Sequence, residues 1–186
     1  VVIDYAKKDA EEIYIRIRAF NRGKEAAPLH VLPTLWFRNT WSWGESWGPR
    51  PGLRLRSPLP GASWSVEANH PGWKDYVLSG REGARLLFTG NETNARKLWG
   101  TENGSPWVKD AFHRDVVGGE KDAVNPAMEG TRMAAWYRFD VPPDSVVEME
   151  LQLARAGQKR CFEDFDRVLR AREKEAGLFF RDLIPS

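Results

Sequence analysis

The chain has 186 residues, of which 41% are hydrophobic and 29% charged, a composition typical of one globular domain or of one domain with an appendage. Its 28 basic and 26 acidic side chains leave a net charge of +2, and the basic residues are spread along the chain, so nucleic acids and anionic membranes are poor candidates for partners. The single cysteine, Cys161, excludes a disulfide framework, and no apolar run approaches the roughly 18 residues of a membrane-spanning helix. The lone cysteine and the lack of a secretory signal lead us to expect a cytoplasmic protein.

The first forty residues predict strands from their hydrophobic patterns. Val1 to Ala6 is β-branched and apolar, and Ile13 to Phe20 alternates apolar and polar residues with period two, as a half-buried strand does. Leu29 to Arg38 carries apolar side chains on both faces, which predicts cover on both sides. Pro33 lies inside this run and has no backbone N–H to donate, so it marks an edge or a bulge.

The middle of the chain predicts further strands separated by long irregular stretches. Residues 39–61 are rich in glycine and proline and predict a loop, and residues 91–125 predict irregular structure with a helical turn or two at Lys109 to Val116. Gly80 to Gly83 lies between two strand-like runs and predicts a β-hairpin. The predicted strands of this part are Ser63 to Ala68, Trp73 to Ser79, Ala84 to Thr89, Thr131 to Phe139 and Val147 to Leu153.

The spacing of apolar residues changes near the C-terminus. From Phe162 to Leu183 they recur at intervals of three and four, which predicts one long amphipathic helix. Many strands followed by one helix favour an antiparallel β-sandwich with a terminal helix over a β-α-β alternation. We therefore divide the chain into a mainly β sandwich domain at residues 1–158 and a helix at residues 159–186.

A tryptophan-rich loop is the most distinctive feature of the sequence. Four of the nine tryptophans lie between His30 and Trp47, more than the exit of a core strand requires. Indole faces stack on the C–H faces of sugar rings while neighbouring polar groups bind the hydroxyls, so the loop is a candidate carbohydrate-binding surface. Exposed aromatic patches also mark contacts with other domains, and this alternative stays open. The candidate residues are Arg38, Asn39, Trp41, Trp43 and Trp47.

No motif identifies a catalytic or metal site. Two carboxylates of the irregular stretch could flank a glycosidic bond, but catalytic carboxylates are recognised by geometry, and solvated loop residues are the simpler interpretation. His30, His70 and His113 match no zinc or iron spacing, and the sequence has no P-loop, no G-x-G-x-x-G and no G-x-S-x-G. We therefore expect no catalytic residue, no metal and no cofactor. Lys109, Asp110 and His113 are retained as candidate binding or interdomain residues of the irregular stretch.

Five stretches of the sequence carry a family resemblance. They are PLHVLPTLWFRNTWSWG (Pro28 to Gly44), LLFTGNETN (Leu86 to Asn94), VKDAFHRDVVGG (Val108 to Gly119), AVNP (Ala123 to Pro126) and GTRMAAWYRFDV (Gly130 to Val141). Together they resemble the N-terminal region of bacterial glucosidase-like proteins of glycoside hydrolase family 63, the group that includes the processing mannosyl-oligosaccharide glucosidases. The resemblance covers most of the chain in the same order.

The resemblance implies a supersandwich-like β-sandwich that precedes an (α/α)6 catalytic barrel in the same polypeptide. The family's catalytic carboxylates lie on the barrel, so none can be assigned to a residue of this chain, and the helix beginning near Phe162 would lead towards the barrel. The chain begins in a strand-like run without an initiator methionine and ends in an apolar helical pattern, so we expect it to be part of a longer protein. The resemblance implies that this longer protein is an inverting α-glycosidase.

Three hypotheses follow for the tryptophan-rich loop. In the first, the domain scaffolds the barrel and lines the rim of its sugar-binding cleft, and the isolated chain is inactive. In the second, the chain is an autonomous carbohydrate-binding module that binds oligosaccharides through Trp41, Trp43 and Trp47. In the third, the indoles serve only as contacts between domains and touch no sugar. An apolar interdomain face left exposed on the isolated chain would predict self-association.

Overall fold

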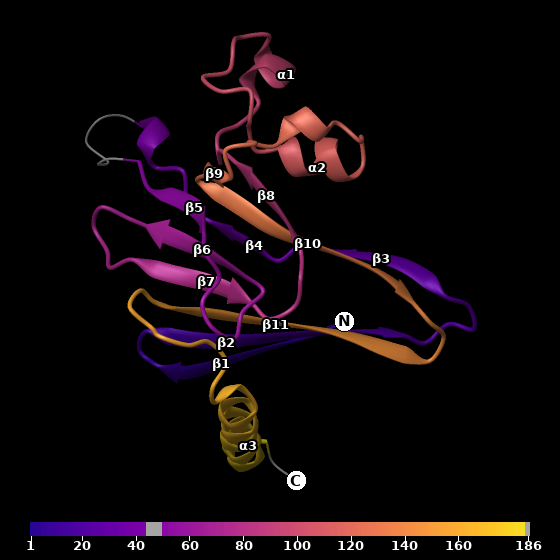
Figure 1. Ribbon diagram of the computed structural model, residues 1–186. Helices are drawn as coiled ribbons and strands as arrows, with labels where there is room; N and C mark the ends of the chain where they lie inside the picture. Colours follow the sequence, from indigo (N-terminus) through magenta and orange to yellow (C-terminus); the bar gives the residue numbers. More distant parts are fainter. Residues whose placement is uncertain (44–49, 185–186) are drawn as a thin grey trace.

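The computed structural model describes residues 1–43 and 50–184, without the side chains of Trp43 and Asp182, and shows an antiparallel β-sandwich with a C-terminal helix (Figure 1). Among the described residues the larger sheet has seven strands in the order β1, β2, β11, β7, β6, β5, β9. Their bounds are Val2–Asp9 (β1), Glu12–Asn21 (β2), Ser145–Arg155 (β11), Tyr76–Gly80 (β7), Trp64–Asn69 (β6), Gly52–Arg56 (β5) and Glu129–Gly130 (β9). The predicted fold class is thereby confirmed.

The smaller sheet is built around one central strand, β10, Arg132–Val141. Its first residues pair on one side with β8, Arg85–Thr89, and on the other with β4, Thr34–Trp36, while its second half pairs with β3, Ala27–Val31. The predicted strand around Pro33 is therefore interrupted at the proline, as its missing backbone donor requires.

The core lies between the two sheets. Alternation along β10 places Met133, Ala135 and Tyr137 on one face. These three residues are buried in a single cluster with residues of the larger sheet such as Val66 and Met149. Burying one such large side chain contributes about 1.5–3 kcal/mol. The opposite face of β10 and β8 is covered as well, because Ala134 and Leu87 pack against a short helix described below.

The predicted hairpin at residues 80–83 is wrong. β7 pairs with β6 and β11 in the larger sheet, whereas β8 pairs with β10 in the smaller one, so the chain crosses between sheets here. Gly80 is needed for packing rather than for a hairpin turn, because a Cβ at this position would lie 2.3 Å from the indole of Trp64. Sequence spacing shows that a link is short but not which sheet each flanking strand joins.

The two stretches predicted as irregular contain regular elements that tertiary contacts support. The loop after β4 contains the 3-10 helix η1, Trp41–Trp43, and then β5, which pairs with β6 and β9. The later stretch contains α1 (Ala95–Trp99), α2 (Ala111–Val116) and the 3-10 helix η3 (Lys121–Ala123), of which α2 fulfils the predicted helical turns. In Figure 1 η1, α1 and α2 lie at one end of the sandwich, which we call the loop end, and α3 lies at the other.

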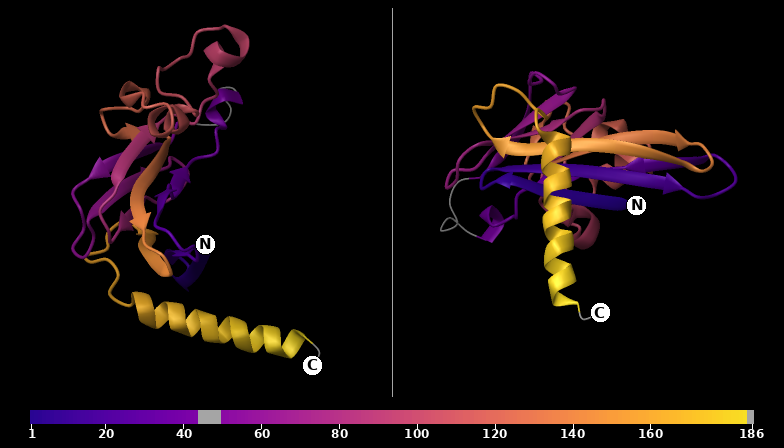
Figure 2. Two further views of the ribbon diagram at one scale, coloured as in Figure 1. Left: turned by 90° about the vertical axis from the view of Figure 1, so that its right-hand side faces the viewer. Right: turned by 90° about the horizontal axis from the view of Figure 1, so that it is seen from below.

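The terminal helix α3, Phe165–Leu183, packs on the sandwich only through its first turns. Phe165, Val168 and Leu169 are buried against Ala6 and Tyr14 of β1 and β2. The helix starts three residues later than predicted, because Phe162 adopts a positive φ of 62° and closes the preceding turn. Figure 2 shows the rest of α3 extending away from the strands. Within the described residues no helix is both long and apolar enough to cross a membrane.

Candidate functional site

At the loop end, the candidate residue Trp41 belongs to a cluster that sequence reasoning did not identify. Its indole Nε1 donates to Glu92 Oε1 at 2.7 Å, and the same oxygen lies 2.9 Å from Nη2 of Arg50. The Arg50 guanidinium also lies 5.9 Å from the centre of the Trp41 ring. Trp41 is therefore half-buried and bound within the protein. A Cβ at Gly90 would lie 2.1 Å from Glu92 Oε2, so a side chain here would require the carboxylate to move.

Asn91, next to Glu92 and buried, connects three segments that are distant in the sequence. Its side chain donates to the carbonyl oxygen of Phe37 at 2.8 Å, and its backbone N–H donates to Thr131 Oγ1 at 2.8 Å. Asn39 accepts from the backbone of Ser42 and contacts the carbonyl of Asn91 at 3.5 Å. These bonds fix the path of the chain from β4 into η1. Among the other candidates, Arg38 is exposed, Trp43 is described only by its backbone, which belongs to η1, and Trp47 lies outside the described residues.

The second group of candidates lies close by, around the start of α2. Asp110 accepts two hydrogen bonds from Asn94 Nδ2, at 3.1 and 3.2 Å, and Asn94 also caps α1 through the backbone of Lys97. The carbonyl of Lys109 accepts from Arg132 Nη1 at 2.6 Å. His113 is exposed on α2. The structure thus brings both candidate groups to the same end of the sandwich, joined by residues 91–94, and uses Asp110 for internal bonding.

The carboxylates of this region do not form an acid–base pair. Asp115 is buried and makes two 2.7 Å bonds to the guanidinium of Arg85, while Glu120 pairs with Arg114. Within residues 1–43 and 50–184 no three metal-binding side chains are grouped so that they could hold an ion. A cleft of about 450 Å³ opens beside the cluster and is lined by Arg50, Arg54 and Trp107 among others. The loop end can therefore contact a ligand or a partner, but Asp110, Asp115 and Glu120 are engaged in structural bonds.

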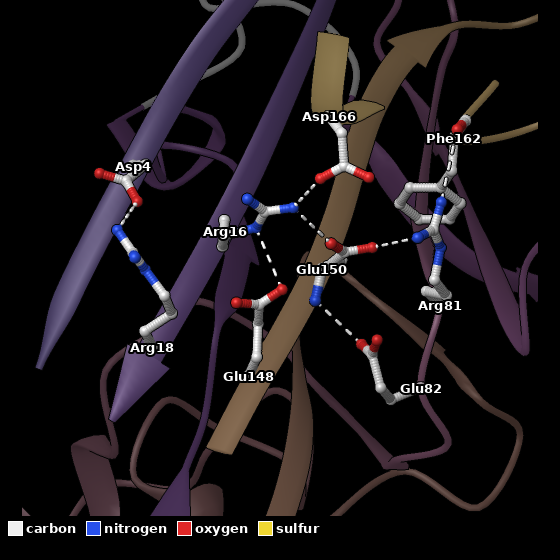
Figure 3. Close-up of polar contacts among 9 residues, drawn as sticks. All are labelled: Asp4, Arg16, Arg18, Arg81, Glu82, Glu148, Glu150, Phe162 and Asp166. Carbon is white, nitrogen blue, oxygen red and sulfur yellow. Dashed lines mark hydrogen bonds and ion pairs between the residues drawn. The ribbon is translucent and has the colours of Figure 1, made fainter. Parts of the chain in front are cut away.

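At the opposite end, five charged residues hold α3 to the sheet, and we call them the α3 anchor (Figure 3). Arg16 of β2 bonds to Glu150 Oε1 at 2.9 Å, to Glu148 Oε1 at 3.1 Å and to Asp166 in the first turn of α3. Arg81, from the link between the sheets, pairs with the other oxygen of Glu150. The anchor thus joins β2, β11, the β7–β8 link and α3.

The titration behaviour of the anchor follows from burial and from its ion pairs. Burial raises the pKa of the Glu150 carboxyl, although hydrogen bonding to Arg16 and the charge of Arg81 oppose the shift. The hydrogen bond from Arg16 lowers the pKa of Asp166. Arg16 and Arg18 on β2 lie opposite Glu150 and Glu148 on β11. Opposite charges at alternate positions of two strands are a signal of cross-strand pairing that is visible in the sequence.

Beyond the anchor, α3 has a strongly apolar surface that the described residues leave uncovered. Phe179 is 61% exposed and Ile184, just after the helix, is 67% exposed. The exposed apolar residues of this segment, which we call the α3 tip, are Leu178, Phe179, Phe180, Leu183 and Ile184. Such a cluster on a helix that extends beyond its own domain is typical of a contact with another domain or chain.

The fold defines this chain as an antiparallel β-sandwich with an anchored, projecting helix. No protein-family model matches the sequence. The chain is 30% identical over 219 residues to a protein of Saccharomyces cerevisiae (strain ATCC 204508 / S288c) named Uncharacterized protein YMR196W. The match covers 100% of this chain and 20% of the yeast protein, so the chain spans about a fifth of the length of that relative. The name of the relative states no activity.

Proposed function

We propose that this chain is the non-catalytic N-terminal domain of an α-glucosidase-like glycoside hydrolase. In this proposal the chain scaffolds an (α/α)6 catalytic barrel of the same polypeptide and lines one rim of its sugar-binding cleft. The observation that carries the proposal is the α3 tip, an uncovered apolar surface on a helix whose base is fixed by the α3 anchor. The family resemblance of the sequence supplies the identity of the proposed partner.

The energetics of α3 support a further packing partner. The helix has 19 residues, and helices of this length receive most of their stability in proteins from tertiary packing. Only its first turns pack on the sandwich. Burying each large apolar side chain of the α3 tip would contribute about 1.5–3 kcal/mol. A groove between helices accepts such a face readily, because side chains spaced by three and four residues form ridges that fit between those of a neighbour.

The loop end supports a second contact with the same partner. In the left view of Figure 2, α3 leaves the lower end of the sandwich while α1 and η1 extend from the upper end towards the same side. On α1, Leu98 is 60% exposed and Trp99 67% exposed. A barrel on this side would contact α3 below and α1 and the candidate residues around η1 above. This arrangement is the basis for assigning the loop end to the rim of the cleft.

The alternative of an autonomous carbohydrate-binding module built on Trp41, Trp43 and Trp47 has less support. Within the described residues, Trp41 is half-buried and its N–H is already bonded to Glu92. A stacking platform needs an indole face open to the ligand. We therefore retain the scaffold proposal as the function of this chain.

A glucosidase assay combined with a change at the α3 tip tests the proposal. The isolated chain should hydrolyse no α-gluco-oligosaccharide, whereas the polypeptide that includes the barrel should do so with inversion, as followed by NMR of the released anomer. Phe179→Ser with Phe180→Ser should lower the melting temperature of the longer polypeptide but not of the isolated chain. The isolated chain should self-associate through its exposed α3 tip, and this double substitution should abolish that association, as measured by analytical ultracentrifugation.

Val146→Ser is a suitable control, since Val146 is 50% exposed but lies on β11. It should change neither the melting temperature nor the association. Turnover by the isolated chain would contradict the proposal, as would equal effects of the tip and control substitutions.

A further inference from the structure

A second aromatic surface, which shares Trp36 with the tryptophan-rich stretch but not Trp41, Trp43 or Trp47, lies where the two sheets meet. It is a groove of about 360 Å³, lined by residues of β4 and β7 and of the turn between β6 and β7. Its aromatic lining consists of Trp36, Phe37, His70, Trp73 and Tyr76. We call it the aromatic groove. Its volume is within the range of small-ligand sites, which are also mainly apolar with a few polar groups.

The aromatic groove is held in shape by ring contacts and a tight turn. The ring of Trp73 stacks on that of His70 with centroids 4.4 Å apart and planes inclined by 21°. His70 in turn contacts Phe37 at 5.6 Å. The turn is closed because Gly72 donates its N–H to His70 Nδ1 at 3.1 Å and Trp73 donates its N–H to the carbonyl of His70 at 3.0 Å. Trp73 is therefore positioned before any ligand binds.

Both indoles of the groove are open, unlike that of Trp41. Trp73 is 70% exposed and Trp36 is 55% exposed. Neither indole N–H forms a hydrogen bond with the described part of the chain. These two side chains are therefore exposed enough to stack on a ligand, Trp73 with the ring face that does not contact His70.

Charged groups fixed at one edge complete the aromatic groove. Glu11 accepts hydrogen bonds from Lys74 and, at 3.0 Å, from Arg155. The hydrogen bond from Lys74 lowers the pKa of Glu11, so its carboxylate is charged at neutral pH. Lys7 of β1 also lines the groove. A ligand that fills the groove thus meets both aromatic side chains and charged hydrogen-bonding groups.

We propose that the aromatic groove binds a pyranose oligosaccharide. The apolar C–H faces of its rings stack on Trp36 and Trp73, and its hydroxyls bond to Glu11 and Lys74. A purely apolar ligand would cover these charges without hydrogen-bonding them, which is unfavourable, whereas sugar hydroxyls can both donate to the carboxylate and accept from the ammonium group. All groups involved belong to this chain, so binding does not require the barrel of the proposed function.

Titration of the isolated chain with maltotetraose, cellotetraose and mannotetraose, followed by calorimetry and tryptophan fluorescence, tests this site. At least one of these sugars should bind with a millimolar or lower Kd. Trp36→Ala and Trp73→Ala should each raise that Kd roughly tenfold, because each removes an aromatic stacking surface. Trp73→Phe should restore part of the affinity, since it returns an aromatic face.

Phe20→Ala is the matched control, because Phe20 is an exposed aromatic residue of β2 that does not line the groove. It should leave the Kd unchanged. Circular dichroism melts of each variant check that the fold is intact. Lack of binding to all three sugars, a Kd in the Trp36→Ala and Trp73→Ala variants equal to that of the parent chain, or binding of a proline-rich peptide in place of sugars would overturn the inference. None of these outcomes bears on the glucosidase assay, so the two proposals can fail separately.

Discussion

Glu148 and Glu150 are similar residues on one strand, but their burial differs, and so does their expected contribution to stability. Both pair with Arg16, at 3.1 and 2.9 Å. The side chain of Glu148 is 41% exposed, whereas that of Glu150 is 7% exposed and also pairs with Arg81. Exposed ion pairs contribute little because water screens them, while removing one partner of a buried pair leaves an uncompensated charge.

Glu150→Gln should therefore lower the free energy of unfolding by roughly 2–3 kcal/mol, and Glu148→Gln by about 0–1 kcal/mol. Urea denaturation of the two variants and the parent chain measures both values. Because the two substitutions are chemically identical and lie on the same strand, equal losses would show that burial of Glu150 is not what makes it important.

At the scale of elements, α3 combines two halves with different roles. Phe165 in its first turn is fully buried, lies 5.0 Å from Tyr14 and has the guanidinium of Arg16 5.1 Å from its ring. Phe179, four turns later, is exposed. One half therefore stabilises this domain, and the other half is available to a partner.

Phe165→Ala should cost about 3–5 kcal/mol of unfolding free energy, because it leaves a cavity beneath the helix. Phe179→Ala should change it by less than about 0.5 kcal/mol, as is usual at exposed positions. Denaturant titrations compare the two. If Phe165→Ala does not fold, Phe165→Leu, with a smaller volume change, serves as the second variant. A large loss for Phe179→Ala would show that the α3 tip packs within the isolated chain.

At the scale of the whole molecule, the direction of α3 depends on ion pairs at its base. Asp164 lies within 3.6 Å of Lys8 and bonds to Arg167, and Asp166 bonds to Arg16. The hydrogen bond from Arg167 lowers the pKa of Asp164, and that from Arg16 lowers the pKa of Asp166. A carboxyl with a lowered pKa stabilises the fold above its unfolded pKa, and this contribution is lost as the pH falls through its folded pKa.

Acidification from pH 7 to about pH 3 should therefore reduce stability less in Asp166→Asn than in the parent chain, since the variant has already lost this contribution. The urea midpoints at the two pH values give the comparison. Glu163→Gln is the control, because the described residues offer Glu163 no hydrogen bond or ion pair. An equal pH dependence in the parent chain and Asp166→Asn would exclude a role for this carboxylate.

The features of the fold that could be predicted from the sequence are those specified by residues close together in the chain. Alternation predicted β2, β10 and β11 and the inward face of β10, because a buried face imposes period two on a strand. The link at Gly80 to Gly83 was misassigned and β5 was not recognised, because strand pairing is decided by residues far away in the sequence. The aromatic groove was missed because Trp36 and Trp73 are separated by 37 residues (73 − 36) and meet only when β4 and the β6–β7 turn come together.

The sequence by itself determined an antiparallel sandwich, a terminal amphipathic helix and an aromatic loop after β4, since each depends on short-range periodicity or composition. Only the tertiary structure decided that Trp41 is bound to Glu92 and that Glu150 joins two arginines. It also showed that the far half of α3 is left uncovered. The physical reason is that burial, ion pairing and open aromatic faces are properties of residues brought together by strand pairing, and local spacing does not specify those neighbours.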